Sequence, residues 1–299
     1  MIHEFGVEPE LAATWGVLAE FRYFVAAFGL GTTRMVSRYP KDWRQMVWAI
    51  AAPTTELERK RLEVLLLRFS EAMVRRSGPY DSERGWLQNA VSEHRRAPFA
   101  GILARTGAGG AVLGVDQLES TEAWKCPAGM ACNRVASRMA AALAPVLRNS
   151  RRVALIDPHF GPENARFRRP LQAMLRAMLV ARPGTAPDEV LVLTSVKSTA
   201  EFFVAECQRQ LPRVTPRGVQ IRLRRLRERP GGERLHNRYV LTDIGGVAFG
   251  VGLDEGAPEE SDDINILSED QLALRQQQYI GSAMAFDAVE SDVIIDGAG

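Results

Sequence analysis

The sequence predicts an α/β fold in which a mixed sheet is flanked by helices and preceded by a mainly helical N-terminal region. From Arg151 onward, apolar strand-like runs alternate with helical segments, which is the pattern of an α/β layer. Before about residue 98 the apolar spacing is mostly helical instead. The 299 residues can form two ordinary domains, and 46% hydrophobic with 25% charged residues is typical of a soluble globular protein. We therefore expect a mainly helical region over residues 1–118 and an α/β domain over residues 119–299.

The first region is expected to contain four helices followed by a hairpin. Apolar residues recur at near-helical spacing over residues 9–28, and shorter helices are expected at 42–51 and 83–95. The clearest helix follows Pro53-Thr54-Thr55-Glu56, where a Thr with acids close behind suits a helix start, and it ends near Ser77. Two short β-like runs at 99–104 and 111–115 flank a glycine-rich segment, which predicts the hairpin.

The second region is expected to alternate strands and helices and to end its sheet in an antiparallel hairpin. Strands are expected at residues 153–157, 189–194, 219–226, 235–243, 247–253 and 263–267. Helices are expected at residues 133–147, 162–181, 198–211 and 269–278. Because buried strands separated by helices of this length usually pair in parallel, the sheet should be mainly parallel, with a hairpin turn at Ile244-Gly245-Gly246.

Bulk properties exclude several classes of protein. The net charge is only +2, so the chain has no uniformly basic coat. No apolar run approaches the roughly 20 residues that span a bilayer, and we expect no membrane partner. With three Cys and nothing that resembles a secretory signal, the expected compartment is the cytoplasm. Cys126 and Cys132 are spaced more widely than the usual zinc pairs, so neither a metal nor another cofactor is expected.

The strand expected at residues 235–243 carries the strongest candidate site. Alternate residues of a strand share a face, so His236 and Arg238 would stand side by side, with Asp243 further along. An imidazole can attack or shuttle a proton near neutral pH, and a guanidinium can hold phosphate oxygens in a fork. His-x-Arg alone is common in strands. At His236 and Arg238, however, strands and helices alternate before the pattern and a glycine hairpin follows it, and this context favours a phosphate site.

Two nearby features could extend this site. Asp157 and His159 lie at the carboxyl end of the first expected strand, the edge at which α/β sheets bind ligands, although Asp157 could equally cap the next helix. The stretch that leads into His236 is rich in arginine and could follow a nucleic-acid backbone, or it could be a charge-protected edge strand. The arginines concerned are Arg222, Arg224, Arg225 and Arg227.

The stretch from His236 to Asp243 resembles the His-x-Lys-x4-Asp signature of the phospholipase D superfamily. The strand that begins at residue 153 is similar to the first strand of many such domains, and residues 262–267 resemble the acidic or amide-bearing strand after the signature hairpin. The resemblance begins at about residue 119 and implies a phospholipase D-like fold. Two positions depart from the family pattern: Arg238 replaces the family's Lys, and Gly250-Val251-Gly252-Leu253 replaces a Gly-Ser-x-Asn pattern.

The resemblance implies a metal-independent phosphodiesterase. His236 would attack the phosphorus and form a phosphohistidine, Arg238 would hold phosphate oxygens, and Asp243 would orient the opposing histidine. Asp263 or Asn265 would support the site. Family members use two motifs per active site and this chain has one, so the resemblance implies a homodimer with the site on its two-fold axis.

Two hypotheses of different classes follow. The first is a cytoplasmic phosphodiester hydrolase, expected to be a nuclease, whose site is shared by two chains. The second is a catalytically weakened phospholipase D-like subunit with a structural or nucleic-acid-binding role in a larger complex, such as a bacterial defence system. Val251 and Leu253 favour the second, because their side chains cannot donate hydrogen bonds to a phosphate. The arginine-rich strand is compatible with both.

Overall fold

The computed structural model describes residues 2–52, 55–180, 182 and 184–299. The chain divides into two compact units, an N-terminal unit of residues 2–127 and a C-terminal unit of residues 128–299. The sequence placed this boundary after residue 118. Leu118 and Trp124 are buried in the core of the N-terminal unit and keep the intervening segment there. The helix start expected at Pro53-Thr54 and the helix end expected at Ala181 lie outside the described residues.

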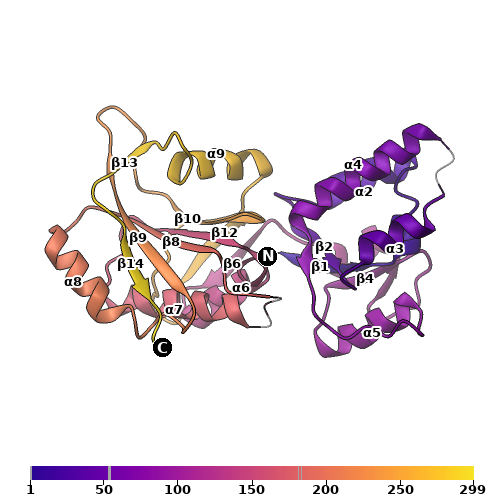
Figure 1. Ribbon diagram of the computed structural model, residues 1–299, viewed down its shortest axis with the longest axis horizontal. Coiled ribbons are helices and arrows are strands. Elements are labelled where there is room, and N and C mark those ends of the chain that lie inside the picture. Colours follow the sequence, from indigo (N-terminus) through magenta and orange to yellow (C-terminus); the bar gives the residue numbers. More distant parts are fainter. Residues whose placement is uncertain (1, 53–54, 181, 183) are drawn as a thin grey trace. The chain divides into compact units, whose positions relative to one another are not determined.

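The N-terminal unit alternates strands and helices around a parallel sheet. Its strands are β1 (His3–Val7), β2 (Arg34–Arg38), β3 (Val74–Arg75), β4 (Gly101–Ala104) and β5 (Val112–Gly114). Its helices are α1 (Pro9–Ala12), α2 (Leu18–Ala27), α3 (Trp43–Ile50), α4 (Glu56–Ala72) and α5 (Trp86–Arg96), followed by the 3-10 helices η1 (Val115–Ser120) and η2 (Glu122–Trp124). The strand order is β3-β2-β1-β4-β5, and each neighbouring pair is parallel. Helices α2 and α4 lie on one side of the sheet and α5 on the other (Figure 1).

This sheet was not expected in a mainly helical region. β1 and β2 are buried along most of their length, yet they contain Glu4 and Ser37, whose side chains are hydrogen-bonded at 2.7 Å. Polar residues in so short a run hide the apolar pattern of a buried parallel strand. Helices α3, α4 and α5 lie close to their expected positions, whereas the single helix expected at residues 9–28 is divided into α1 and α2.

The hairpin expected at residues 99–115 is wrong. β4 and β5 are parallel, with Ile102 opposite Val112. Gly109 and Gly110 adopt φ angles of 78° and 62°, a left-handed conformation that only glycine enters without cost. These residues let the connection fold back so that β5 starts again at the same end as β4. The glycine-rich segment therefore indicated a turn, but it did not indicate whether the next strand would pair in parallel or antiparallel.

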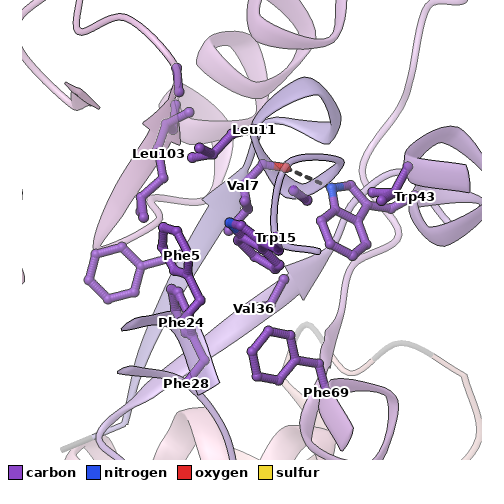
Figure 2. Packing of buried hydrophobic residues seen from close by; sticks show 14 of the residues in the cluster. Phe5, Val7, Leu11, Trp15, Phe24, Phe28, Val36, Trp43, Phe69 and Leu103 are labelled. Carbon is purple, nitrogen blue, oxygen red and sulfur yellow. Dashed lines mark hydrogen bonds between the residues drawn. The ribbon is translucent and has the colours of Figure 1, made fainter. Parts of the chain in front are cut away.

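Aromatic side chains form the centre of the N-terminal core. Figure 2 shows Trp15 beside Phe24 and close to Phe69, with ring centroids 4.6 Å and 5.6 Å from that of Trp15. Nε1 of Trp43 donates a hydrogen bond of 2.6 Å to the carbonyl oxygen of Val7, drawn as a dashed line in Figure 2. This bond satisfies the indole while its ring is fully buried. The aromatic cluster thus holds α2, α3 and α4 against β1.

The C-terminal unit contains the larger sheet. Its strands are β6 (Gly129–Asn133), β7 (Arg152–Ile156), β8 (Glu189–Ser195), β9 (Gln220–Glu228), β10 (Arg238–Thr242), β11 (Gly245–Phe249), β12 (Ser261–Ile266), β13 (Phe286–Ala288) and β14 (Val293–Asp296). Its helices are α6 (Ala136–Asn149), α7 (Ala165–Leu179), α8 (Ala200–Gln210) and α9 (Glu269–Tyr279). The order β13-β9-β8-β7-β10-β11-β12-β6 describes the sheet, with β14 also paired to β9.

The expected α/β fold, a mixed sheet flanked by helices, is confirmed. β7, β8 and β9 are parallel, and β10, β11 and β12 continue the sheet in antiparallel pairs. Helices α6, α7 and α8 lie on one side of the sheet and α9 lies on the other (Figure 1). The sequence did not indicate β6, β13 or β14. Within the described residues, no helix combines the length and the apolar character that crossing a membrane requires.

Candidate functional site

Four side chains lie near one another at the edge of the C-terminal sheet where β7 and β8 end. Asp157 follows β7 directly, His159 lies two residues beyond it, and Lys197 comes shortly after β8. Because β10 runs antiparallel to β7, its first residue, Arg238, lies at the same edge. Ligands of α/β sheets bind at such carboxyl edges. We call Asp157, His159, Lys197 and Arg238 the carboxyl-edge cluster.

Asp157 is the buried member of the cluster. Its Oδ1 accepts a hydrogen bond from the backbone N–H of His159 and its Oδ2 accepts one from that of Leu253, both at 2.8 Å. Burial raises the pKa of Asp157, whereas the two N–H donors and the positive charge of Arg238 act in the opposite direction. Asp157 does not cap α7, since Asn164 accepts the hydrogen bond at that helix start. The capping interpretation of Asp157 is therefore wrong, and its place in a functional site stays a prediction.

His159 and Lys197 form the exposed side of the cluster. Nζ of Lys197 lies in hydrogen-bond contact with Nδ1 of His159. Burial and the charge of Lys197 lower the pKa of His159, so its imidazole is neutral at pH 7 and can accept this hydrogen bond. Burial also lowers the pKa of Lys197, and Arg238 adds to this effect while Asp157 opposes it. The sequence interpretation missed Lys197. Its position just after β8, next to β7 in the sheet, was the signal.

Arg238 brings an unused donor to the same edge. The side chain is half-buried, and its Nε is buried without a hydrogen-bond partner among the described residues. A buried N–H that lacks an acceptor is costly, by about 1 to 3 kcal/mol. Its charge acts on Asp157, His159 and Lys197 together. The cluster thus holds several N–H donors around one buried carboxylate, an arrangement that can accommodate an additional anion.

A loop that follows β11 forms one wall beside the cluster. The carboxylate of Asp262 accepts hydrogen bonds from the N–H groups of Gly250 at 2.9 Å and Val251 at 3.0 Å, and a longer one of 3.4 Å from Gly252. The next N–H, that of Leu253, is bonded to Asp157. The N–H groups of this loop are therefore engaged inside the protein, and the side chains of Val251 and Leu253 offer no donors in their place.

The acid of β12 that contacts the loop beside the cluster is Asp262 rather than Asp263 or Asn265. Along β12 buried and exposed residues alternate, which places Asp262 on the buried face and Asp263 and Asn265 on the exposed face. Asp262 is 3% exposed and binds the loop described above. Asp263 and Asn265, which were expected to support the site, thus lie on the face of β12 opposite to Asp262.

Asp243 lies at the opposite end of β10 from Arg238. Its Oδ1 accepts hydrogen bonds from the N–H groups of Arg151 at 2.9 Å and Arg152 at 3.1 Å. At about 3.3 Å per residue, the seven steps along the chain from His236 to Asp243 separate them by roughly 20 Å. His236 is exposed just before β10, where its Nδ1 lies 3.4 Å from the carbonyl oxygen of Arg234. Asp243 thus ties the start of β7 to the hairpin of β10 and β11.

The arginine-rich strand β9 is covered rather than open. β13 and β14 pair with it and bring acids from the end of the chain. Nε and one terminal nitrogen of Arg224 are each 2.8 Å from the carboxylate oxygens of Asp292. Arg225 is 4% exposed, forms an ion pair with Glu290 and donates to the carbonyl oxygen of Ser198.

The nucleic-acid role expected for Arg224 and Arg225 is corrected accordingly, whereas for Arg222 and Arg227 it stays a prediction. Arg225 is buried and Arg224 is neutralised, so neither is available to a phosphate backbone in this structure. Arg222 lies 3.8 Å from Asp292, and Arg227 is exposed. The sequence suggested few compensating acids because those acids lie some 60 residues further on, for example 68 residues from Arg224 to Asp292.

The three cysteines are free and at least half-buried. Cys126 is half-buried, Cys132 and Cys207 are buried, and all three are free thiols. Burial raises the pKa of each of these thiols, which disfavours the thiolate that metals require. Within the part of the chain that the structure describes, no group of three or more His, Cys, Asp or Glu side chains could hold a metal ion.

Comparisons with known proteins add little to this geometry. No family model matches the chain, and no curated protein matches it. Among solved structures, the chain is similar to TrmBL2, described as an archaeal chromatin protein with a novel mode of DNA binding. The two are 10% identical, the likeness covers 78% of this chain and 83% of that chain, and the TM-score is 0.29.

Proposed function

We propose that the C-terminal unit is a phospholipase D-like module that binds a phosphodiester group at the carboxyl-edge cluster, and that nucleic acid supplies this group. The observation that carries the proposal is the convergence of Lys197, His159 and Arg238, with the buried Nε of Arg238 lacking an acceptor. Phosphate oxygens are acceptors that a guanidinium and an ammonium recognise well. The pKa of Lys197 is lowered mainly by burial and further by the charge of Arg238, and a bound anion would offset the repulsion between these two cations.

Binding is better supported than cleavage. The loop N–H groups that could stabilise a transition state are already bonded to Asp262 and Asp157. Val251 and Leu253 add no donors, and this favours a structural or nucleic-acid-binding subunit of a larger complex.

Phosphodiester hydrolysis is the second candidate function. His236 is exposed two residues before Arg238, and alternate residues of an extended segment share a face. A ring nitrogen of His236 could attack a phosphorus held by Arg238, while the leaving oxygen takes a proton from the histidine of a second chain. Water would then hydrolyse the phosphohistidine. This mechanism requires a homodimer with a shared site.

Replacing Lys197 or Arg238 by Ala should weaken binding of a labelled single- or double-stranded oligonucleotide by about 10- to 100-fold, because a hydrogen bond to a charged group contributes roughly 1.5 to 3 kcal/mol. Fluorescence anisotropy with purified full-length protein measures this loss. Arg138→Ala, which removes an exposed arginine from α6, is the matched control and should bind like the wild type. Equal losses in all three variants would indicate diffuse electrostatic attraction and would contradict the proposal.

The same preparations separate binding from hydrolysis. DNA and RNA are incubated with wild-type protein and His236→Ala in EDTA. Cleavage that persists in EDTA and disappears in the variant establishes the second candidate. Binding without cleavage, equal in both proteins, leaves the binding module as the function.

Affinity should rise as the pH falls from about 7 to about 5. The pKa of His159 lies below its ordinary value of 6.5, so the imidazole is neutral at pH 7 and acquires its charge only at lower pH. A bound phosphodiester favours the imidazolium, and proton uptake therefore accompanies binding. Titrations at a series of pH values with wild type and His159→Gln check this. A flat profile in the variant is expected, and an unchanged slope would assign the effect to another group.

A further inference from the structure

Helix α4 of the N-terminal unit presents an apolar stripe to solvent. Leu57, Val64 and Leu67 are 56%, 55% and 59% exposed. With Lys60, which is also exposed, they are spaced by three and four residues and lie on one face of the helix. We call Leu57, Lys60, Val64 and Leu67 the α4 stripe. The opposite face is buried in the core of the unit through Leu62, Leu65, Leu66 and Phe69.

The α4 stripe has the spacing of a coiled-coil seam. If Leu57 and Val64 are a positions, Lys60 and Leu67 are d positions. The two g positions that flank the seam are then both glutamate, Glu56 and Glu63, and the two e positions are both arginine, Arg61 and Arg68. The buried residues fall at b, c and f, which leaves the seam free of the unit's own core.

The flanking charges select both the partner and its direction. In a parallel pair, each g residue faces the e residue five positions later on the other helix, which places Glu56 opposite the partner's Arg61. In an antiparallel pair, g faces g and e faces e, which would bring glutamate to glutamate and arginine to arginine. The pattern is therefore complementary to itself in one orientation, and a second copy of α4 fits it.

We infer that α4 pairs in parallel with α4 of a second chain, about a two-fold axis that runs along the helices. The methylene stem of Lys60 packs at the seam while its ammonium reaches water. This residue weakens the pair, and the stripe spans only three turns, so the affinity is modest. The inference rests on the N-terminal unit alone and is independent of the proposed function.

Sedimentation equilibrium of the full chain tests the inference. The wild type should dimerise at about 100 µM, above the roughly micromolar Kd expected for a small helical interface. Val64→Glu/Leu67→Glu should be monomeric, with an unchanged circular dichroism melt because both side chains are exposed. Leu274→Glu changes an equally exposed leucine on α9 and should leave the dimer intact. A monomeric wild type, or a dimer that survives the double substitution, overturns the inference.

Two further substitutions test the orientation without relying on loss of association. Lys60→Leu should tighten the dimer about tenfold or more, because it completes the apolar seam. Arg61→Glu should weaken the dimer, and combining it with Glu56→Arg should restore the affinity by exchanging the two charges. Failure of the double exchange to rescue association would exclude the parallel arrangement. A control melt of each variant confirms that α4 remains folded.

Discussion

Replacing Arg76 by Ala is expected to lower the free energy of unfolding of the N-terminal unit by about 3 to 5 kcal/mol, because it removes a buried ion pair with Glu4 and one of the two arginines that hold Glu93. Nε of Arg76 lies 2.5 Å from Oε1 of Glu4, and its Nη1 lies 3.1 Å from Oε1 of Glu93. All three side chains are at most 6% exposed. The guanidinium also donates to the carbonyl oxygen of Pro98 and lies 3.8 Å from the ring centre of Phe99. One side chain therefore joins β1 to α5 and to the segment before β4.

Urea unfolding followed by tryptophan fluorescence measures this loss for the N-terminal unit specifically. Every tryptophan of the chain belongs to that unit, namely Trp15, Trp43, Trp48, Trp86 and Trp124. Arg95→Ala is the matched control, since Arg95 is an exposed arginine of α5 and should change stability little. A loss in Arg76→Ala no larger than in this control would mean that the two glutamates find other compensation.

Asp262→Ala is expected to destabilise the C-terminal unit by about 2 to 4 kcal/mol, because the N–H groups of the loop lose a buried, charged acceptor. The carboxylate of Asp262 holds the N–H groups of Gly250 and Val251. Their loop leads to Leu253, whose N–H holds Asp157 in the carboxyl-edge cluster. Disorder of the loop should therefore release Asp157 and abolish phosphodiester binding as well.

Hydrogen exchange monitored by mass spectrometry localises the effect of this substitution. Peptides that cover residues 245–256 should lose protection in Asp262→Ala, together with a lower melting temperature. Asp263→Ala changes the neighbouring acid on the exposed face of β12 and should leave both measurements near wild type. Equal effects of the two substitutions would show that Asp262 has no special part in holding the loop.

The fold of the C-terminal unit could largely be predicted, because β7 and β8 are apolar runs that can be recognised as buried strands from the local sequence alone. β6, β13 and β14 are short and partly exposed, so their sequences carry no such pattern. These strands form by pairing with β12 and β9, which are distant in the sequence. β1 was missed for another reason. Glu4 interrupts its apolar run, and this buried charge is compensated by Arg76, which is distant in the sequence.

The same distinction applies to the candidate site. Asp157 and His159 could be predicted from their place at the end of a strand, and Arg238 from its spacing to His236. Lys197 becomes their neighbour only because β8 lies beside β7. Choosing Asp263 over Asp262 was an error of strand parity, which moves a side chain from one face of a sheet to the other. Parity is fixed by the burial of Ile264 and Ile266, not by the acids themselves.

The covering of β9 by β13 and β14 has a consequence for the timing of synthesis. Arg224 leaves the ribosome 68 residues before its partner Asp292. At about 5 to 20 residues per second, the nascent chain waits roughly 3 to 14 s before this charge is matched. During that interval β9 is an open, cationic edge that can bind the RNA of the translating ribosome or the edge of another nascent chain. Slow translation of the codons for residues 229–291 would lengthen the time for which β9 is exposed, whereas the structure of the finished protein would be the same.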